Sequence, residues 1–467
     1  MNFNYNKADK WSILEYSKKL LGKTLEEAVF PDIIDPKRGK GQLGQLVELY
    51  FFGIDNNNRQ EADFPEAGLE LKVSPLKELR NKTLTIKERL VCTMIDFTED
   101  QAIPFEQSHI YLKCAFMLIP FYLHKDSVPV HKLKFIYDVL WQIPEKDLLI
   151  MKQDYEKIIA KIKEGKAHEL SEGDTTYLGA CRKGQKGDAD VYYRLPDGTI
   201  ASIPAPKRAF SLKVQYMRSI LDFAKKSGGQ GSYNISALVH GYGPHLINES
   251  ELKKDSFEHI LLNRLEPFYD KTYQELSQDL GIDTHAKSKY FLIANEILTQ
   301  RKTRGADVTK SEEFVKSGIV IKTIRLNKNG RPAEAMSFEN INYFDILQED
   351  NWYDSRLYDI FTQRFLFVVF QEDANSDVRL KTAFFWTMPA QDLEEAEAYW
   401  LNIKNAVKND TIAPEYFYRE SHHKKFHVRP KGKDSADVTD SPHGGMVKKY
   451  CYWFNHDYIK NIIMNAE

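Results

Sequence analysis

The stretch Asp63-Phe64-Pro65-Glu66-Ala67-Gly68-Leu69-Glu70-Leu71-Lys72 places an acid before a turn and a Glu-x-Lys triplet after it. Apolar and charged residues alternate over residues 69–73, which is typical of a half-buried strand. Successive strand side chains point to opposite faces, so the apolar members should face a core while Glu70 and Lys72 share the other face. The proline and glycine of the turn allow Asp63 to fold back beside Glu70. The sequence thus predicts two carboxylates and a lysine in one place.

Two carboxylates beside a lysine are typical of metal-dependent cleavage of a phosphodiester bond. Mg²⁺ prefers oxygen ligands and takes one or two carboxylates from a protein, leaving room for water and phosphate oxygens. Asp63 and Glu70 would hold the ion, which activates a water and offsets charge on the phosphate. Lys72 would orient or deprotonate that water. The alternative is a solvated ion pair between Glu70 and Lys72 on an exposed strand face.

An amphipathic helix is predicted just upstream, because apolar residues recur there at i, i+3, i+4, i+7 and i+8. They are Leu43, Leu46, Val47, Tyr50 and Phe51. Glu48 lies at the edge of this stripe, fifteen residues before Asp63. It would either face solvent or add a third carboxylate to the acidic set.

The segment Gly41–Glu48, followed by Asp63 and by Glu70-Leu71-Lys72, resembles the catalytic core of the MutH family. That family covers a strand-nicking mismatch-repair endonuclease and type II restriction endonucleases that cut GATC. Residues 164–173 and 207–213 also resemble family segments, the first leading into the DNA-reading half and the second near the major groove. Three separated segments in family order make the nuclease interpretation more specific than the short motif alone.

The resemblance implies an α/β fold with a mixed central sheet, of the restriction-endonuclease-like PD-(D/E)xK type, and Mg²⁺ as cofactor. Asp63, Glu70 and the Leu71 carbonyl would bind the metal. Lys72 would position the attacking water, and Glu48 would complete the acidic set. The products would carry 5′-phosphate and 3′-hydroxyl ends, with cleavage before the G of GATC.

Recognition of DNA must come from base edges in the major groove, because phosphate contacts only set position. Arg208 is the leading candidate for a guanine contact. The other candidates are basic or aromatic residues in or near the family-like segments, or in the second half of the chain: Lys213, Tyr216, Arg182, Lys183, Lys186, Arg429, Lys431 and Lys433.

The 467 residues exceed what one hydrophobic core usually serves, so two domains are expected. The formal net charge is only −2, so DNA binding requires the basic residues to cluster on the surface. Four scattered cysteines without a CxxC pair favour reduced thiols. No apolar run reaches the roughly 18 residues of a membrane span, and a cytoplasmic location is expected.

The chain contains a diverged internal repeat. Residues 23–28 have a counterpart at 271–276, residues 61–73 at 311–323, and residues 208–221 at 450–463. The offsets are 248, 250 and 242 residues. Counterparts in one order at nearly one spacing predict two lobes of the same fold.

The second copy has lost its metal ligands, since its counterparts of Asp63, Glu70 and Lys72 are Glu313, Val320 and Lys322. Valine cannot bind a metal, so this copy is expected to bind DNA or to regulate. The predicted organisation is a catalytic lobe at 1–226, a linker at 227–249 and an inactive lobe at 250–467. Other expected elements are strands at 111–117 and 364–370, a helix at 148–162 and a loop at 431–445.

The sequence therefore predicts a type II restriction endonuclease of the two-lobed MutH-like branch, making Mg²⁺-dependent double-strand cuts, with a second lobe that binds an effector site. Expected partners are double-stranded DNA and, functionally, a cognate DNA methyltransferase; the protein would be a monomer, with dimerisation on DNA an open alternative. A strand-nicking repair enzyme, a methylation-dependent nuclease and a non-catalytic DNA-binding protein remain alternatives. Doubled length opposes the first, and the intact acidic motif opposes the last.

Overall fold

The computed structural model describes most of the chain. Its described ranges are 3–29, 43–55, 61–79, 81–184, 188–227, 232–233, 245–283, 285–300, 306–434 and 436–466. Within these ranges, no helix is both long and apolar enough to cross a membrane. The four cysteines all lie in described ranges, and each is a buried free thiol.

The chain divides into two compact units. Unit 1 contains Met1–Ser256 and Lys310–Gly318, and unit 2 contains Phe257–Thr309 and Ile319–Glu467. Residues 250–256 and 310–318 thus group with unit 1, although the sequence pattern assigned them to the second lobe. Most of the predicted linker at 227–249 lies outside the described residues.

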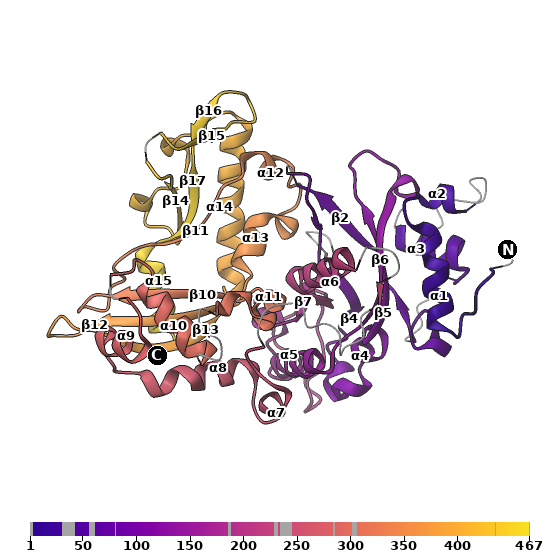
Figure 1. The fold of residues 1–467 in the computed structure, drawn as a ribbon, viewed down its shortest axis with the longest axis horizontal. Helices are drawn as coiled ribbons and strands as arrows, with labels where there is room; N and C mark the ends of the chain where they lie inside the picture. The colour runs from indigo at the N-terminus through magenta and orange to yellow at the C-terminus, as the bar shows by residue number, and fades with distance from the viewer. Residues whose placement is uncertain are drawn as a thin grey trace. The chain divides into compact units, whose positions relative to one another are not determined.

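Unit 1 is built on two sheets (Figure 1). One has the order β3-β2-β5-β6-β9, with β1 paired to β5, and the other has the order β4-β8-β7. The strands are β1 Glu70–Leu71, β2 Ser74–Glu78, β3 Leu84–Ile86, β4 Leu90–Met94, β5 Phe116–Leu123, β6 Lys134–Gln142, β7 Leu178–Arg182, β8 Arg208–Leu212 and β9 Ser232–Tyr233. The helices are α1 Lys10–Ser17, α2 Leu25–Ala28, α3 Leu43–Leu46, α4 His109–Cys114, α5 Glu145–Lys163, α6 Val214–Lys226, α7 Glu249–Leu252 and α11 Glu312–Ser317.

Unit 2 has the sheet orders β10-β12-β13 and β11-β17-β14, with β15 and β16 as a separate hairpin. The strands are β10 Val320–Leu326, β11 Met336–Asn340, β12 Phe365–Glu372, β13 Val378–Trp386, β14 Phe426–Pro430, β15 Val438–Asp440, β16 Met446–Lys448 and β17 Tyr450–Phe454. The helices are α8 Phe257–Leu265, α9 Tyr273–Leu280, α10 Lys289–Thr299, α12 Tyr343–Leu347, α13 Arg356–Phe361, α14 Ala390–Lys408 and α15 His456–Met464. The long helix α14 lies alongside the β11-β17-β14 sheet (Figure 1).

The internal repeat is visible in the topology of the units. In unit 1, β1 runs parallel to β5, which pairs antiparallel with β6; in unit 2, β10, β12 and β13 pair in the same way. The order β4-β8-β7 recurs as β11-β17-β14. Helices α5 and α14 each follow a proline and span 19 residues. Each unit is α/β with mixed sheets, as predicted.

Two local predictions are wrong. The expected strand at 111–117 begins only at Phe116, because residues 109–114 form helix α4, whose start is capped by the Ser108 hydroxyl accepting from the Tyr111 amide at 3.3 Å. The expected loop at 431–445 contains strand β15, which pairs with β16. The helix at 148–162 and the strand at 364–370 are confirmed as parts of α5 and β12.

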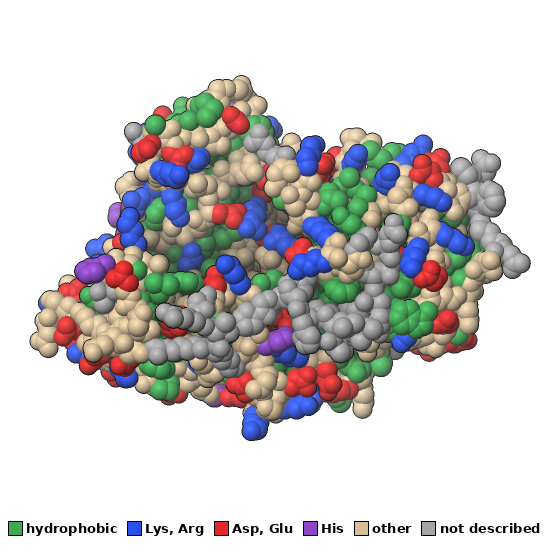
Figure 2. Space-filling model, viewed as in Figure 1, with side chains coloured by type: hydrophobic (Ala, Val, Ile, Leu, Met, Phe, Trp, Pro, Cys, Tyr) green, Lys and Arg blue, Asp and Glu red, His purple; other side chains and the backbone are tan. Residues whose placement is uncertain are grey.

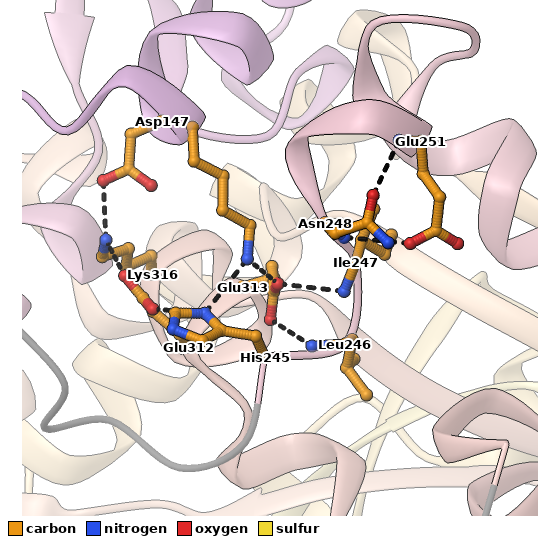
Figure 3. Close-up of polar contacts among 10 residues, drawn as sticks. Asp147, His245, Leu246, Ile247, Asn248, Glu251, Glu312, Glu313 and Lys316 are labelled. Carbon is orange, nitrogen blue, oxygen red and sulfur yellow. Dashed lines mark hydrogen bonds and ion pairs between the residues drawn. The ribbon is translucent and has the colours of Figure 1, made fainter. Parts of the chain in front are cut away.

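Helix α11, the counterpart of the turn in the first copy, is held in unit 1 by buried charges (Figure 3). Lys316 is fully buried and pairs with Asp147 at 2.6 Å and with Glu312. Glu313 is also buried, where it pairs with Lys146 and accepts the Leu246 amide at 3.2 Å. Burial opposes the charged form of Glu313, but Lys146 outweighs it and lowers the pKa of this carboxyl. Glu313 is therefore a packing residue of unit 1.

Candidate active site

The predicted turn before β1 is present and tight. Pro65–Ala67 form a single 3₁₀ turn, and Gly68 adopts a left-handed backbone with φ of 61° that favours glycine. The Phe64 amide donates to the Leu69 carbonyl at 2.9 Å, which closes the loop. The chain is thereby reversed, so that the residue before the turn lies beside the strand after it.

Asp63 and Glu70 meet as the pattern predicts. The Leu71 amide donates to Asp63 Oδ2 at 3.0 Å, and the Asp63 amide donates to Glu70 Oε2 at 3.2 Å. Lys72 Nζ lies 2.6 Å from Glu70 Oε1. Strand β1 is fixed by its parallel pairing with β5, which places Glu70 opposite Met117. Each polar group is thus positioned by backbone contacts.

The ion pair between Glu70 and Lys72 is partly buried, because Glu70 is enclosed and Lys72 is about one fifth exposed, so it is not a solvated surface pair. Glu70 is 1% exposed, as buried as its neighbours Leu69 and Leu71. Burial disfavours the charged form of Lys72, but the adjacent Glu70 carboxylate outweighs it and raises the pKa of this lysine. A buried charge is retained only when it is paired. Lys72 is therefore a cation held in place by the Glu70 carboxylate.

Glu48 lies on a π-helical turn, Val47–Phe52, that continues α3. The apolar stripe predicted around it is buried. Burial, and next the Asp63 carboxylate, raise the pKa of Glu48 to about 7, with Glu70 adding a further repulsion. Short π-helical insertions occur frequently at functional sites. Glu48 therefore belongs electrostatically to the acidic set.

Lys113 is a further candidate site residue that the sequence prediction did not include. It lies on α4, and its positive charge opposes the upward pKa shifts of both Glu48 and Asp63. An uncertain register around α4, where a strand was expected, hid this lysine. The site thus combines three carboxylates with two lysines.

The residues fit a divalent cation that takes few ligands from the protein and most of its ligands from water and substrate oxygens. Burial, and then the charge of Glu70, raise the pKa of Asp63, so the acidic set carries mutual repulsion that a cation would relieve. No group of three or more His, Cys, Asp or Glu side chains among the described residues is placed to hold a metal by itself. Mg²⁺ suits such a site, because it takes one or two carboxylates and completes its shell with water and substrate oxygens.

The raised pKa of Glu48 predicts a pH-dependent cost in stability. An acid whose pKa is raised on folding stabilises the folded state fully below its usual pKa of 4.5 and loses that contribution as the pH rises through about 7. Glu48→Gln should therefore increase the free energy of unfolding in EDTA at pH 8 by about 2 kcal/mol and raise the melting temperature accordingly. At pH 4 the substitution should leave the melting temperature unchanged. Exposed Glu66→Gln, in the turn before β1, is the control. A gain of equal size at both pH values would contradict this account.

Two residues predicted to contact DNA are buried. Tyr216 is 0% exposed, and its hydroxyl donates to buried Asp147 at 2.8 Å. Arg208 is 7% exposed and donates to the Ala180 carbonyl at 2.8 Å. Strand β8 lies between β4 and β7, so both of its edges are paired. Arg208 and Tyr216 therefore have buried structural partners, and groove contacts by these two residues stay a prediction.

The remaining candidates in unit 1 differ in exposure. Arg182 is exposed at the end of β7, and Lys183 next to it is partly exposed. Lys213 occupies the N-cap position of α6, and its ammonium group donates to the Thr175 carbonyl. Lys186 lies outside the described residues. Arg182 and Lys183 are thus the best-placed cations.

In unit 2, Arg429, Lys431 and Lys433 are all exposed. Arg429 pairs with Glu420 at 3.4 Å, and its guanidinium lies 4.9 Å from the centre of the Trp453 ring. Lys431 Nζ lies 5.8 Å from the same ring. These residues form a cationic and aromatic surface on β14 and β17.

The chain resembles known proteins over its whole length. Residues 52–154 and 305–397 match the family described as the DNA mismatch repair enzyme MutH, one segment in each half of the chain. The chain is 29% identical to the type II restriction enzyme Sau3AI of Staphylococcus aureus over 97% of both proteins. It is 30% identical to the DNA mismatch repair protein MutH of Shewanella woodyi, over 44% of this chain and 85% of that protein. The chain therefore belongs to the MutH family.

Proposed function

We propose that this protein is a type II restriction endonuclease that uses Mg²⁺ to cut both strands of DNA at GATC. The observation that carries the proposal is the partly buried cluster of Asp63, Glu70 and Lys72, brought together by the turn before β1. It lies in a chain whose whole length aligns with a type II restriction enzyme. The MutH relatives align with less than half of the chain, which favours the restriction assignment over strand-nicking repair.

Asp63, Glu70 and the Leu71 carbonyl would hold the Mg²⁺, which when bound supplies an activated water and offsets charge on the phosphate. Glu70 fixes the Lys72 ammonium group at 2.6 Å, so that it can donate to the attacking water or a phosphate oxygen. Glu48, with a pKa near neutrality, can accept a proton from that water. The products would be 5′-phosphate and 3′-hydroxyl ends.

Unit 2 would bind a second DNA site and stimulate cutting. Its Arg429, Lys431 and Lys433 are exposed, and phosphate contacts from such residues supply most of the affinity for DNA. Arg182 and Lys183 would contact the DNA that unit 1 cuts. A cognate methyltransferase would protect host DNA. The protein would be a monomer, with dimerisation on DNA as the alternative.

A time course on supercoiled plasmids tests this function. With Mg²⁺, the enzyme should convert the plasmid to linear DNA, and a plasmid with two GATC sites should be cut several-fold faster than one with a single site. Equal rates on the two plasmids would remove the effector role of unit 2. Nicked circles as the final product would instead identify a strand-nicking repair enzyme.

A further inference from the structure

Unit 2 contains a cavity of about 320 Å³ beside Lys322, the counterpart of Lys72 in the second copy. Lys322 and Arg325 of β10 line it, together with Lys287 and Tyr290 near the start of α10 and with Ser337 of β11. Figure 2 shows a hollow in this part of unit 2, with several Lys and Arg side chains around it and some Asp and Glu side chains among them. The cavity is therefore a basic recess.

Lys322 is the counterpart of Lys72 but has no carboxylate in the place of Glu70. Val320 replaces the glutamate, and the described residues place no carboxylate within ion-pair distance of Lys322. Its ammonium group donates to the Ser337 carbonyl at 2.8 Å and lies 4.6 Å from the centre of the Phe338 ring. Burial and the nearby Lys431 lower the pKa of Lys322 to about 8, whereas Glu70 raises that of Lys72.

A second ammonium group, that of Lys431, contacts the same two residues, Ser337 and Phe338. Lys431 Nζ donates to Ser337 Oγ at 2.8 Å and to the Phe338 carbonyl at 3.2 Å. Glu334 is the one acid among the described lining residues, and it is exposed. Four cations therefore gather around one recess: Lys287, Lys322, Arg325 and Lys431. Such an arrangement attracts an anion with several acceptor oxygens.

We propose that this cavity binds a backbone phosphate of DNA without a metal ion, using Lys322 as the central cation. The position of Lys322 on β10 matches that of Lys72, which directly follows β1. A duplex bound to unit 2 would therefore place a phosphate beside Lys322, as the duplex cut by unit 1 would place one beside Lys72. The loss of the metal-binding glutamate leaves the phosphate to lysine and arginine alone, which bind phosphate by charge and hydrogen bonds. The inference rests on the proposed role of unit 2 as a DNA-binding lobe.

The test uses full-length protein carrying Glu70→Gln, so that DNA is not cut. Fluorescence anisotropy in EDTA, with a labelled duplex containing GATC, should show two duplexes bound per chain. Adding Lys322→Met should weaken the second binding event about tenfold. Lys328→Met, an exposed lysine of the same unit, should leave it unchanged. Arg325→Gln, an exposed position that packing does not constrain, should weaken it several-fold.

The outcomes separate this inference from the proposed function. Two duplexes bound with equal affinity in the Lys322→Met and Lys328→Met proteins would overturn the inference and leave the effector lobe standing. A single duplex bound by the parent protein would overturn both. A second duplex that requires Mg²⁺ would contradict the metal-free site. A second experiment titrates inorganic phosphate into the protein by calorimetry. If Lys322→Met abolishes phosphate binding but does not change the affinity for the duplex, the cavity is a free-phosphate site and the DNA assignment is overturned.

Discussion

Glu70→Gln is expected to lower the rate of DNA cleavage by at least about 10³-fold. The substitution keeps the shape of a side chain that is 1% exposed, so the fold should be retained. It removes one carboxylate from the metal site and the ion pair that fixes Lys72 at 2.6 Å. Both losses act on the same step, so the effect should not grow much when Lys72→Ala is added. Single-turnover cleavage of a one-site plasmid measures the rate.

Val320→Ala is the matched control for that experiment, because Val320 occupies the place of Glu70 in the second copy. It should cut a one-site plasmid within about twofold of the wild-type rate, since unit 2 has no role in the chemistry. More than a tenth of wild-type activity in Glu70→Gln would contradict the assignment of the active site. So would an equal loss of activity in both variants.

Lys316→Met is expected to destabilise the protein by about 3–5 kcal/mol, the usual effect of breaking a buried ion pair. Lys316 is fully buried and pairs with Asp147 at 2.6 Å and with Glu312. Its loss would leave two carboxylates without their cation. Burial already raises the pKa of Asp147, so this group should take up a proton readily in the variant. The destabilisation should therefore be larger at pH 8 than at pH 5, as measured by thermal unfolding.

Two further variants make this result specific. Lys310→Met changes an exposed lysine near the same helix and should melt within about 1 °C of the wild type. Combining Lys316→Met with Asp147→Asn and Glu312→Gln removes the unpaired charges and should recover part of the lost stability. Identical melting temperatures for the Lys316→Met and Lys310→Met proteins would show that α11 is not held by this network.

The acidic site was predictable because its determinants are local. An alternating strand, a glycine with positive φ and the short spacing between Asp63 and Glu70 together specify the turn and the meeting of the carboxylates. The internal repeat was predictable for a similar reason, since matching strands retain matching sequence offsets. The burial of Glu70 was not predictable from alternation, because neighbouring elements decide whether a polar strand face meets solvent.

The predicted DNA contacts show where packing adds information that the sequence pattern lacked. Tyr216 belongs to a buried stripe on α6 with Met217, Ile220, Leu221 and Ala224, and this periodicity alone would have placed it in the core. Arg208 lies on a strand whose five residues are all buried, because β8 is central in its sheet. A family resemblance favoured both residues as DNA contacts, while packing gives them structural partners.

The grouping of α11 with unit 1 depends on contacts distant in sequence. Lys316 and Asp147 are 169 residues apart, and no local pattern links them. The repeat correctly aligned this helix with the turn before β1, but alignment does not state which unit the helix packs against. The counterparts of the acidic site in the second copy are thereby divided: Glu313 belongs to unit 1, whereas Val320 and Lys322 belong to unit 2.

The most direct test of the central claim is to sequence the ends of fragments produced from unmethylated, adenine-methylated and cytosine-methylated plasmid in Mg²⁺. The unmethylated digest should yield fragments that all begin with 5′-phosphate and GATC, and the Glu70→Gln protein should yield none. Ends at another sequence, or cutting only of methylated DNA, would contradict the proposed specificity. Intact plasmid under every condition would contradict the proposal that unit 1 is a nuclease.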